Sequence, residues 1–203
     1  MTLVLDRFYP IVDSAAWVRR LVPLGVTLIQ LRIKDESDAA TGHQVREAKA
    51  CCARYGAQLI VNDHWELAMA EGCDFVHLGQ GDLDDADLPA LRRAGIRLGV
   101  STHDHAELDR ALSADPDYIA LGPIYPTTLK AMPWAPQGLG RVAEWKRAIG
   151  ARPLVAIGGL TVDRAAGVLA AGADSAAVVT DVLRHPDPED QTRRWIDATR
   201  ALA

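Results

Sequence analysis

The sequence predicts one α/β domain in which eight parallel strands alternate with helices and close into a barrel. Short runs of apolar and β-branched residues recur roughly every 25 residues, and amphipathic stretches separate them. Polar residues follow the carboxyl ends of many of these runs, whereas an open doubly wound sheet gathers its site at one switch point. The pattern therefore favours a (β/α)8 barrel, or TIM barrel, over an open sheet.

The expected strands are short, and several are almost wholly apolar, as in the runs Leu-Val-Ala-Ile and Ala-Val-Val. Such strands are typical of a parallel sheet that is covered by helices. We expect strands at residues 8–13, 27–33, 58–63, 75–79, 97–102, 118–124, 153–159 and 175–180.

Four helices can be bounded from the pattern. Amphipathic stretches predict helices at residues 39–55 and 139–149. Residues 161–171 begin with Thr161, which suits an N-cap, and end before Gly172, which suits a helix stop. Residues 187–203 predict a final helix, and no linker or repeat divides the chain, so we expect a single domain over residues 1–203.

The bulk composition limits the possible functions. The chain has 203 residues, of which 49% are hydrophobic and 24% charged, as in an ordinary globular domain. A net charge of −5 gives no support for binding to nucleic acid or to an anionic membrane. No export leader or bilayer-spanning apolar run is visible, and the three cysteines are not spaced like zinc ligands. We therefore expect a cytoplasmic protein without nucleic-acid or membrane partners.

Cationic side chains gather at the end of the second expected strand. Gln30, Arg32 and Lys34 alternate in the sequence, so they point to one face of that strand, which can be the barrel interior. A buried Arg and Lys need anionic partners, because an unpaired buried charge is costly. Those partners are either the phosphates of a ligand or internal carboxylates such as those of Asp35 and Asp63.

Carboxylates follow the next two strands. Asn62 and Asp63 end the third expected strand, and Asp82 follows the fourth. Two carboxylates without clustered His or Cys form a hard-oxygen site, which suits Mg²⁺ completed by water and substrate phosphate. Asp63 has an alternative role as the N-cap of a helix that starts at His64.

The loops after the last two strands resemble a phosphate site. Gly158 and Gly159 follow the seventh strand, and Val179 and Thr180 end the eighth, which is where barrels of this class bind phosphate. The long loop at residues 125–137 contains three prolines and the cation Lys130, and we interpret it as a candidate lid.

The histidines are weaker evidence for a functional site. His103 and His105 flank Asp104 before an expected helix, which suggests capping more than metal binding. His77 lies within a strand and faces either the core or the site. No Ser/His/Asp or Cys/His constellation is present, so the residues point to two anionic sites in one pocket, one of them with a metal. A phosphorylated substrate that meets a diphosphorylated one satisfies this arrangement.

The motifs together resemble the thiamine-phosphate synthase family. The resemblance covers nearly the whole chain in the family's order and is carried by Gln-Leu-Arg-Ile-Lys-Asp from Gln30, Val-Asn-Asp from Val61, Val-His-Leu-Gly-Gln from Val76 with Asp82, Gly-Val-Ser-Thr-His from Gly99, Leu-Gly-Pro-Ile-Tyr-Pro-Thr from Leu121 with Lys130, Ala-Ile-Gly-Gly from Ala156 and Ala-Val-Val-Thr from Ala177.

This resemblance implies a transferase that joins hydroxymethylpyrimidine diphosphate to a thiazole phosphate, or to its carboxylated form, with Mg²⁺ as cofactor. The products are thiamine phosphate and diphosphate. It also implies catalytic roles for Arg32, Lys34, Ser101 and Lys130 and magnesium ligation by Asp63 and Asp82. By the same resemblance, the pyrimidine diphosphate is bound by Gln30, Arg32, Lys34, Asn62, Ser101 and Lys130, and the thiazole phosphate by Thr127, Thr128, Leu129, Gly158, Gly159, Val179 and Thr180. Leu31 and Ile33 complete the expected substrate-binding residues.

The sequence departs from the family's pattern at Leu129, where a second Thr is usual, and at Thr180, where Ser is more usual. Three alternatives stay open: a related thiazole tautomerase, a sugar-phosphate epimerase or similar barrel that only the phosphate loops support, and a non-catalytic protein that binds thiamine precursors. The cations, together with Asp63 and Asp82, argue against the tautomerase, which needs no metal or diphosphate site. The sequence indicates two small phosphorylated partners and leaves the oligomeric state open.

Overall fold

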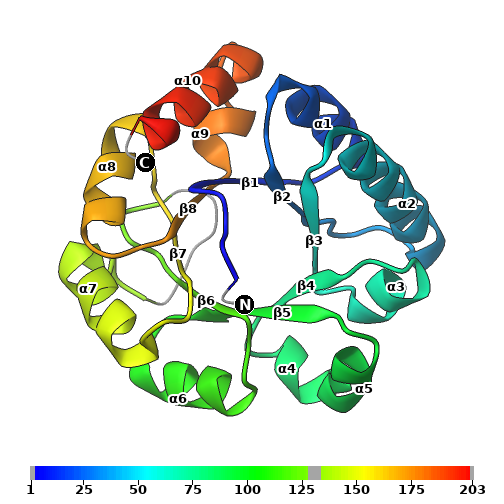
Figure 1. The fold of residues 1–203 in the computed structure, drawn as a ribbon, viewed down its shortest axis with the longest axis horizontal. Coiled ribbons are helices and arrows are strands. Elements are labelled where there is room, and N and C mark those ends of the chain that lie inside the picture. The colour runs from blue at the N-terminus through cyan, green and yellow to red at the C-terminus, as the bar shows by residue number, and fades with distance from the viewer. Residues whose placement is uncertain (1–2, 128–133, 202–203) are drawn as a thin grey trace.

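The computed structural model describes residues 3–127 and 134–201 and confirms the predicted barrel. Eight parallel strands pair in sequence order, and β8 pairs with β1 to close the ring (Figure 1). The strands are β1 Phe8–Val12, β2 Leu28–Leu31, β3 Gln58–Asn62, β4 Phe75–Leu78, β5 Arg97–Thr102, β6 Tyr118–Leu121, β7 Leu154–Ile157 and β8 Ser175–Val178. Most of them end one to three residues earlier than predicted at the carboxyl end.

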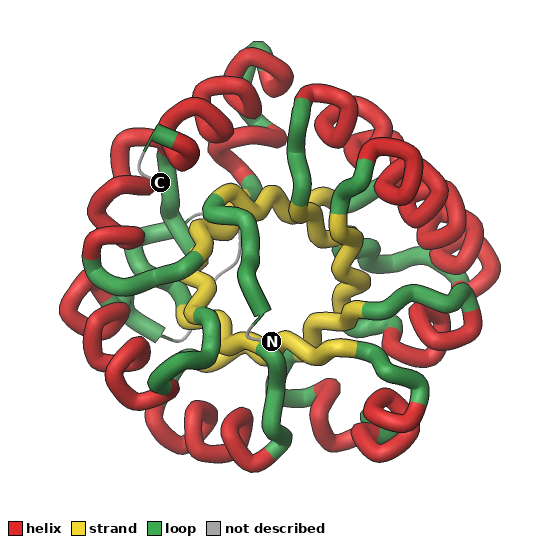
Figure 2. Tube along the Cα trace, viewed as in Figure 1, coloured by secondary structure: helices red, strands yellow, loops and turns green. Residues whose placement is uncertain are grey.

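Helices surround the barrel as an outer ring (Figure 2). They are α1 Ala15–Leu21, α2 Asp38–Tyr55, α3 Trp65–Ala70, α4 Asp82–Asp85, α5 Leu88–Arg93, α6 His105–Ser113, α7 Gly138–Ile149, α8 Val162–Ala170, α9 Thr180–Leu183 and α10 Pro188–Arg200, with a 3₁₀ turn, η1, at Val22–Leu24. The four helices that the sequence bounded each begin within one residue of the expected position. Among the described helices, none has the length and hydropathy that a bilayer crossing requires.

Side-chain alternation divides the core into two layers. Strand residues such as Ile29, Val61 and Val100 point outward and pack with the helices in the larger hydrophobic cluster. Their neighbours along the strands point inward and form a separate cluster inside the barrel. The parity of a residue in its strand therefore decides whether it faces a helix or the barrel interior.

The interior of the barrel is apolar at one end and polar at the other. Tyr9, Phe75 and Tyr118 lie in the inner cluster together with Leu5, whose segment precedes β1 and crosses the amino-terminal opening of the barrel (Figure 1). Towards the carboxyl ends of the strands the buried inward residues become polar, beginning with Gln30 and Asn62. The fold thus closes one end and leaves polar groups at the other, where barrel enzymes place their sites.

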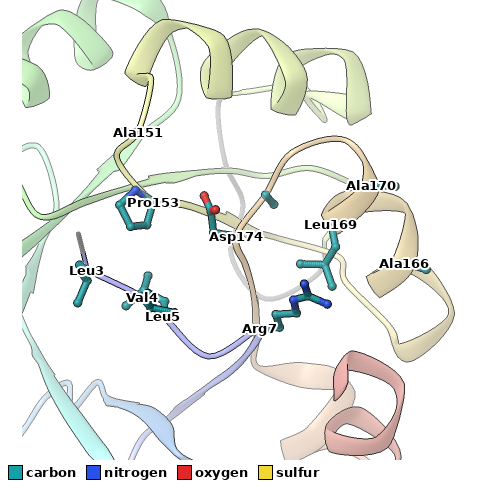
Figure 3. Close-up of a pocket in the computed structure, with 11 residues that line it drawn as sticks. Leu3, Val4, Leu5, Arg7, Ala151, Pro153, Ala166, Leu169, Ala170 and Asp174 are labelled. Carbon is teal, nitrogen blue, oxygen red and sulfur yellow. The ribbon is translucent and has the colours of Figure 1, made fainter. Parts of the chain in front are cut away.

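A pocket of about 550 Å³ lies at the amino-terminal end (Figure 3). It is lined by Leu3, Val4, Leu5 and Arg7 from the segment before β1 and by Pro153 and Asp174, which precede β7 and β8. Its lining is otherwise small or apolar and belongs to the opposite end of the barrel from the predicted site residues. This pocket is therefore not the site that the sequence indicates.

Gly99 makes room for Tyr118 inside the barrel. A Cβ atom at Gly99 would lie 2.1 Å from Cζ of the Tyr118 ring, which no side chain tolerates without a shift. We expect Gly99→Ala to lower the free energy of unfolding by about 1–3 kcal/mol, the usual cost of overpacking. Urea denaturation measures this. Gly140→Ala, in α7 with no atom within 4 Å of its Cβ, is the control and should be neutral or slightly stabilising. Equal stability of the two variants would contradict the packing argument.

Candidate functional site

The structure brings the predicted residues of strands β2 to β5 together at the carboxyl end of the barrel. Lys34, which follows β2, forms an ion pair with Asp63, which follows β3. Asp63 and Asp82 lie close enough for their carboxyl groups to share a hydrogen bond. These contacts link residues from three successive strand ends into one polar group at the barrel mouth.

The two cations that follow β2 differ in their partners. Lys34 pairs with Asp63, so the internal ion pair considered from the sequence is present for this lysine. Arg32 is half-buried, and its guanidinium has no hydrogen bond or ion pair within residues 3–127 and 134–201. A half-buried cation without a partner favours an anionic ligand at this position.

Asp63 does not cap a helix, so the alternative role considered for it is wrong. The N-cap of α3 is His64, and no side chain makes a capping hydrogen bond there. Asp63 has a left-handed backbone with φ of 62°, and its main-chain N–H donates to the carbonyl of His77 at 2.9 Å. The backbone thus directs the carboxylate toward Lys34 and Asp82.

The two carboxylates suit a divalent cation. Burial and the adjacent charge of Asp63 raise the pKa of Asp82, while a hydrogen bond from the Gly79 N–H at 3.0 Å opposes that shift. A cation between the two carboxylates would relieve their repulsion. No group of three or more His, Cys, Asp or Glu that could hold a metal occurs among the described residues. Mg²⁺ is usually held by one or two carboxylates together with water and substrate phosphate. The observed donor set therefore fits Mg²⁺.

Gly79 permits the close approach of Asp82. A Cβ at Gly79 would lie 2.9 Å from Oδ2 of Asp82, so Gly79→Ala must displace that carboxylate. We expect this variant to weaken the apparent affinity for Mg²⁺ by about tenfold, the usual scale for disturbing a ligand's support. A magnesium titration of turnover measures the change. Gly81→Ala, which meets no atom within 4 Å, is the control, and an unchanged affinity in Gly79→Ala would argue against ligation by Asp82.

Two buried side-chain amides have unused hydrogen-bonding atoms beside this group. Asn62 is only 4% exposed, and its Nδ2 has no partner among the described residues. Gln80 donates to the carbonyl of Ser101 at 2.7 Å, whereas its Oε1 is buried without a partner in the same part of the chain. A buried unpaired donor is costly, so the Asn62 amide favours an acceptor atom of a ligand.

A hydrogen-bonded chain of buried side chains crosses the interior below the mouth. Gln30 Nε2 donates to the Tyr9 hydroxyl at 2.8 Å, and the hydroxyls of Tyr9 and Tyr118 are 3.0 Å apart. The Tyr118 hydroxyl is 2.7 Å from Nδ1 of His77, whose Nε2 is 2.8 Å from Oγ of Ser101. Burial lowers the pKa of His77 to about 4 and raises the pKa of both phenols, so all three rings are neutral near pH 7.

Sequence reasoning missed Tyr9 and Tyr118 and left the direction of His77 open. His77 faces the site side of the barrel interior, since it contacts Ser101. The signal that could have found the tyrosines is strand parity. Tyr9 lies two residues before Ile11, which also faces the interior. Tyr118 pairs with Gly99 of β5, and Gly99 has the same strand parity as Ser101.

The side chains of Leu31 and Ile33 point away from the barrel mouth. They are 1% and 2% exposed and pack in the outer core between barrel and helices. Their side chains therefore cannot line the mouth, and only their main-chain atoms could reach a ligand there. Alternation of the strand explains this, because Gln30 and Arg32 occupy the opposite parity.

The loops after β7 and β8 form a second part of the mouth. Gly158 and Gly159 have φ of 99° and 65°, and a Cβ at Gly159 would lie 2.4 Å from the carbonyl oxygen of Pro126. Arg164 donates to the carbonyl of Gly159 and covers the Tyr125 ring, with 4.4 Å from Cζ to the ring centre. This loop follows β7, whereas Asp63 and Asp82 follow β3 and β4, so the two groups of residues lie at different strand ends around the mouth.

The last predicted residues have mixed outcomes. Val179 is the N-cap residue of α9, and Thr180 begins that helix. Both residues follow directly after β8, the strand that pairs with β7. Thr127 is described, whereas Thr128, Leu129, Lys130 and the middle of the candidate lid lie outside the described residues. On its described side, Trp134 stacks on His103 with ring centres 4.0 Å apart.

The capping interpretation of the His-Asp-His segment is confirmed. Asp104 is the N-cap of α6, and its Oδ1 accepts from the N–H of Glu107 at 2.9 Å. Nδ1 of His103 is 2.7 Å from Oε2 of Glu107, and Nε2 of His105 is 2.6 Å from Oε1 of Glu144. Each histidine is thus paired with a carboxylate.

Comparison with known proteins gives one consistent family. The family described as "Thiamine monophosphate synthase" matches residues 2–182. A thiamine-phosphate synthase of Rhizobium etli is 63% identical over 195 residues, covering 96% of each chain, and one of Cronobacter sakazakii is 49% identical over 189 residues, covering 93% of this chain and 90% of its own. Among solved structures, a thiamine phosphate pyrophosphorylase from Pyrococcus furiosus has a TM-score of 0.84 at 25% identity and covers 97% of this chain and 96% of its own.

Proposed function

Since the chain belongs to the thiamine monophosphate synthase family, we propose that the barrel mouth couples hydroxymethylpyrimidine diphosphate to a thiazole phosphate with help from Mg²⁺. The protein is a transferase that forms thiamine phosphate from pyrimidine and thiazole precursors. The observation that carries the detailed proposal is the close pair of Asp63 and Asp82 beside Arg32, a cation without a described partner.

The proposed bond changes balance without a protein nucleophile. The bond between the methylene carbon of the pyrimidine and the diphosphate oxygen breaks, and diphosphate leaves with the electron pair. The ring nitrogen of the thiazole then forms a C–N bond with that carbon. The electron-rich aminopyrimidine stabilises the cation formed in between, so the protein's task is to bind charge and to position two rings. The carboxylated form of the thiazole would also lose CO₂.

The residues after β2 hold the leaving group in this proposal. Arg32 offers its guanidinium to the diphosphate, and Lys34 adds a second charge from its position beside Asp63. Lys130 from the long loop is proposed as a third cation. Negative charge grows on the leaving group as the C–O bond breaks. Cations placed beside that group therefore lower the activation free energy of the reaction.

Asp63 and Asp82 are the proposed magnesium ligands. When bound, the ion would supply charge neutralisation on the diphosphate oxygens. Burial and the nearby Asp63 charge raise the pKa of Asp82, so both disfavour its ionised form. A bound cation would favour the ionised form of both carboxylates. Lys34 already pairs with one of these carboxylates in the free protein, so the ion pair holds the Asp63 side chain in place.

The second binding region takes the thiazole phosphate. Gly158 and Gly159 allow the chain to approach Pro126 closely, and Thr127, Val179 and Thr180 lie at neighbouring loop ends. Loops after the last two strands are the usual phosphate site of this fold. Thr128 and Leu129 are proposed to complete this region on the basis of the family pattern.

A substituent test examines the dissociative step. An electron-withdrawing group on the pyrimidine ring destabilises the cation, so we expect it to slow single turnover by orders of magnitude with a nearly unchanged Kd. A rate that is insensitive to the substituent would contradict the proposed order of bond breaking. A thiazole tautomerase would isomerise its substrate and release no diphosphate, and it would leave the pairing of Asp63 with Asp82 without a role.

A further inference from the structure

We propose that Tyr9, Tyr118 and His77 act as positioning residues that fix Ser101 as a hydrogen-bond donor and Gln30 as an acceptor toward the pyrimidine substrate. The inference rests on the proposed roles of Ser101 and Gln30 in binding that substrate. None of the three rings needs to touch the substrate, because each acts through the next group in one hydrogen-bonded chain.

The chain joins residues that the sequence keeps far apart. It runs from Gln30 on β2 to Tyr9 on β1, crosses the barrel to Tyr118 on β6, and returns through His77 on β4 to Ser101 on β5. All four links lie between 2.7 and 3.0 Å, the normal range for hydrogen bonds. Five of the eight strands therefore contribute to one connected set of polar groups.

The chain is enclosed. Tyr9 and Tyr118 are 1% and 0% exposed, Gln30 is 2% and His77 is 7%. Packing fixes the rings as well: Tyr118 meets Phe75 edge-on at 5.6 Å and stacks on His77 at 5.5 Å. Because water cannot serve these groups in a sealed interior, each hydrogen must be directed at an acceptor within the chain.

The direction of the hydrogen bonds follows from the requirement that each buried hydrogen has an acceptor within the chain. Gln30 uses its amide N–H on Tyr9, so the Tyr9 hydroxyl must donate onward to Tyr118, and Tyr118 must donate to Nδ1 of His77. Nδ1 then accepts, and the ring carries its hydrogen on Nε2, which donates to Ser101. The opposite direction would require the Gln30 amide to present Oε1 in place of Nε2 to the Tyr9 hydroxyl.

The two ends of the chain therefore present fixed chemistry to a ligand. The hydroxyl of Ser101 accepts from His77, so its own hydrogen is free to be donated outward. Gln30 directs an amide N–H at Tyr9, which turns its carbonyl oxygen away from the tyrosines, and no hydrogen bond among the described residues uses that oxygen. The carbonyl oxygen is therefore the acceptor that Gln30 offers to the ligand. An aminopyrimidine diphosphate matches this pair, since its amino group donates and its ring nitrogens and phosphate oxygens accept.

A double-mutant cycle tests whether Tyr118 acts through Ser101. Tyr118→Phe keeps the ring that packs on Phe75 and removes only the hydroxyl. We expect it to lower kcat/KM for the pyrimidine diphosphate by about tenfold in the native background but by less than about twofold in Ser101→Ala. The same factor in both backgrounds would overturn the inference. Tyr55→Phe, on an exposed ring, is the matched control and should leave kcat/KM unchanged.

A second measurement reads the direction of the chain without any turnover. Long-range ¹H–¹⁵N spectra of the ¹⁵N-labelled protein at neutral pH distinguish the two neutral forms of a histidine ring. We expect His77, identified by the signals lost in His77→Gln, to carry its hydrogen on Nε2. A hydrogen on Nδ1 would overturn the inference. If the native protein formed no thiamine phosphate, the proposed function would fail, and this spectrum alone would decide the direction of the chain.

Discussion

Asp63→Asn is expected to lower turnover by about 100-fold or more while the fold persists. The substitution removes one of two carboxylates proposed to hold Mg²⁺, and weaker binding of the ion leaves the charge of the departing diphosphate less neutralised. Asn suits the site better than Ala, because it accepts the left-handed backbone at φ of 62° with little strain. Steady-state formation of thiamine phosphate across a magnesium series measures the effect.

The control for this variant is another aspartate with the same kind of backbone. Asp115 has φ of 48°, pairs with Arg152 on the surface and lies after α6, at the amino-terminal end of β6. Asp115→Asn should keep full turnover, since an exposed ion pair contributes little to stability. If Asp63→Asn turned over as fast as Asp115→Asn, the proposed metal site would be wrong.

Arg32→Ala is expected to lower kcat/KM for the pyrimidine diphosphate by about 100-fold, with the larger part in KM. The reason is that Arg32 is a half-buried cation without a described partner, so its charge is available to the diphosphate. Truncating one member of a desolvated charge pair costs about 2–5 kcal/mol. Arg32→Lys should restore part of the loss, because it returns the charge without the two-pronged geometry.

Initial rates at varied concentrations of the diphosphate separate kcat from KM for these variants. Arg93→Ala is the control, because it removes an exposed cation at the end of α5 and leaves the mouth untouched. Values for Arg32→Ala within about twofold of the native protein would remove Arg32 from the diphosphate site. KM for the thiazole phosphate should be nearly unchanged, since that ligand is assigned to the loops after β7 and β8.

The fold could be predicted because its signals are local and repeated. Apolar runs such as Leu154–Ile157 recur between amphipathic stretches, and glycines such as Gly56 and Gly172 end helices with φ of 70° and 110°. Closure of the barrel was predicted from polar residues at the ends of many strands, and the ring of eight strands bears this out. The strand ends were less accurate: β2 ends at Leu31, two residues before the predicted end, although the Arg32 N–H still donates to the Val12 carbonyl of β1.

The site could be predicted only in outline. Sequence order places Asp63 and Asp82 after neighbouring strands, so their proximity follows from the fold. The ion pair of Lys34 with Asp63 was one of two alternatives, and only the three-dimensional arrangement selects it. The contact of Tyr9 with Tyr118 joins residues 109 positions apart inside the barrel, and no local pattern marks it.

The most direct test of the whole account is the formation of product by the purified protein from both precursors, with and without Mg²⁺. The account predicts thiamine phosphate and diphosphate in equal amounts, no product when a chelator removes the metal, and recovery when magnesium is returned. Product that is indifferent to chelation would contradict the assigned metal site. Diphosphate-free isomerisation of the thiazole, or binding without turnover by the folded protein, would contradict the proposed coupling reaction.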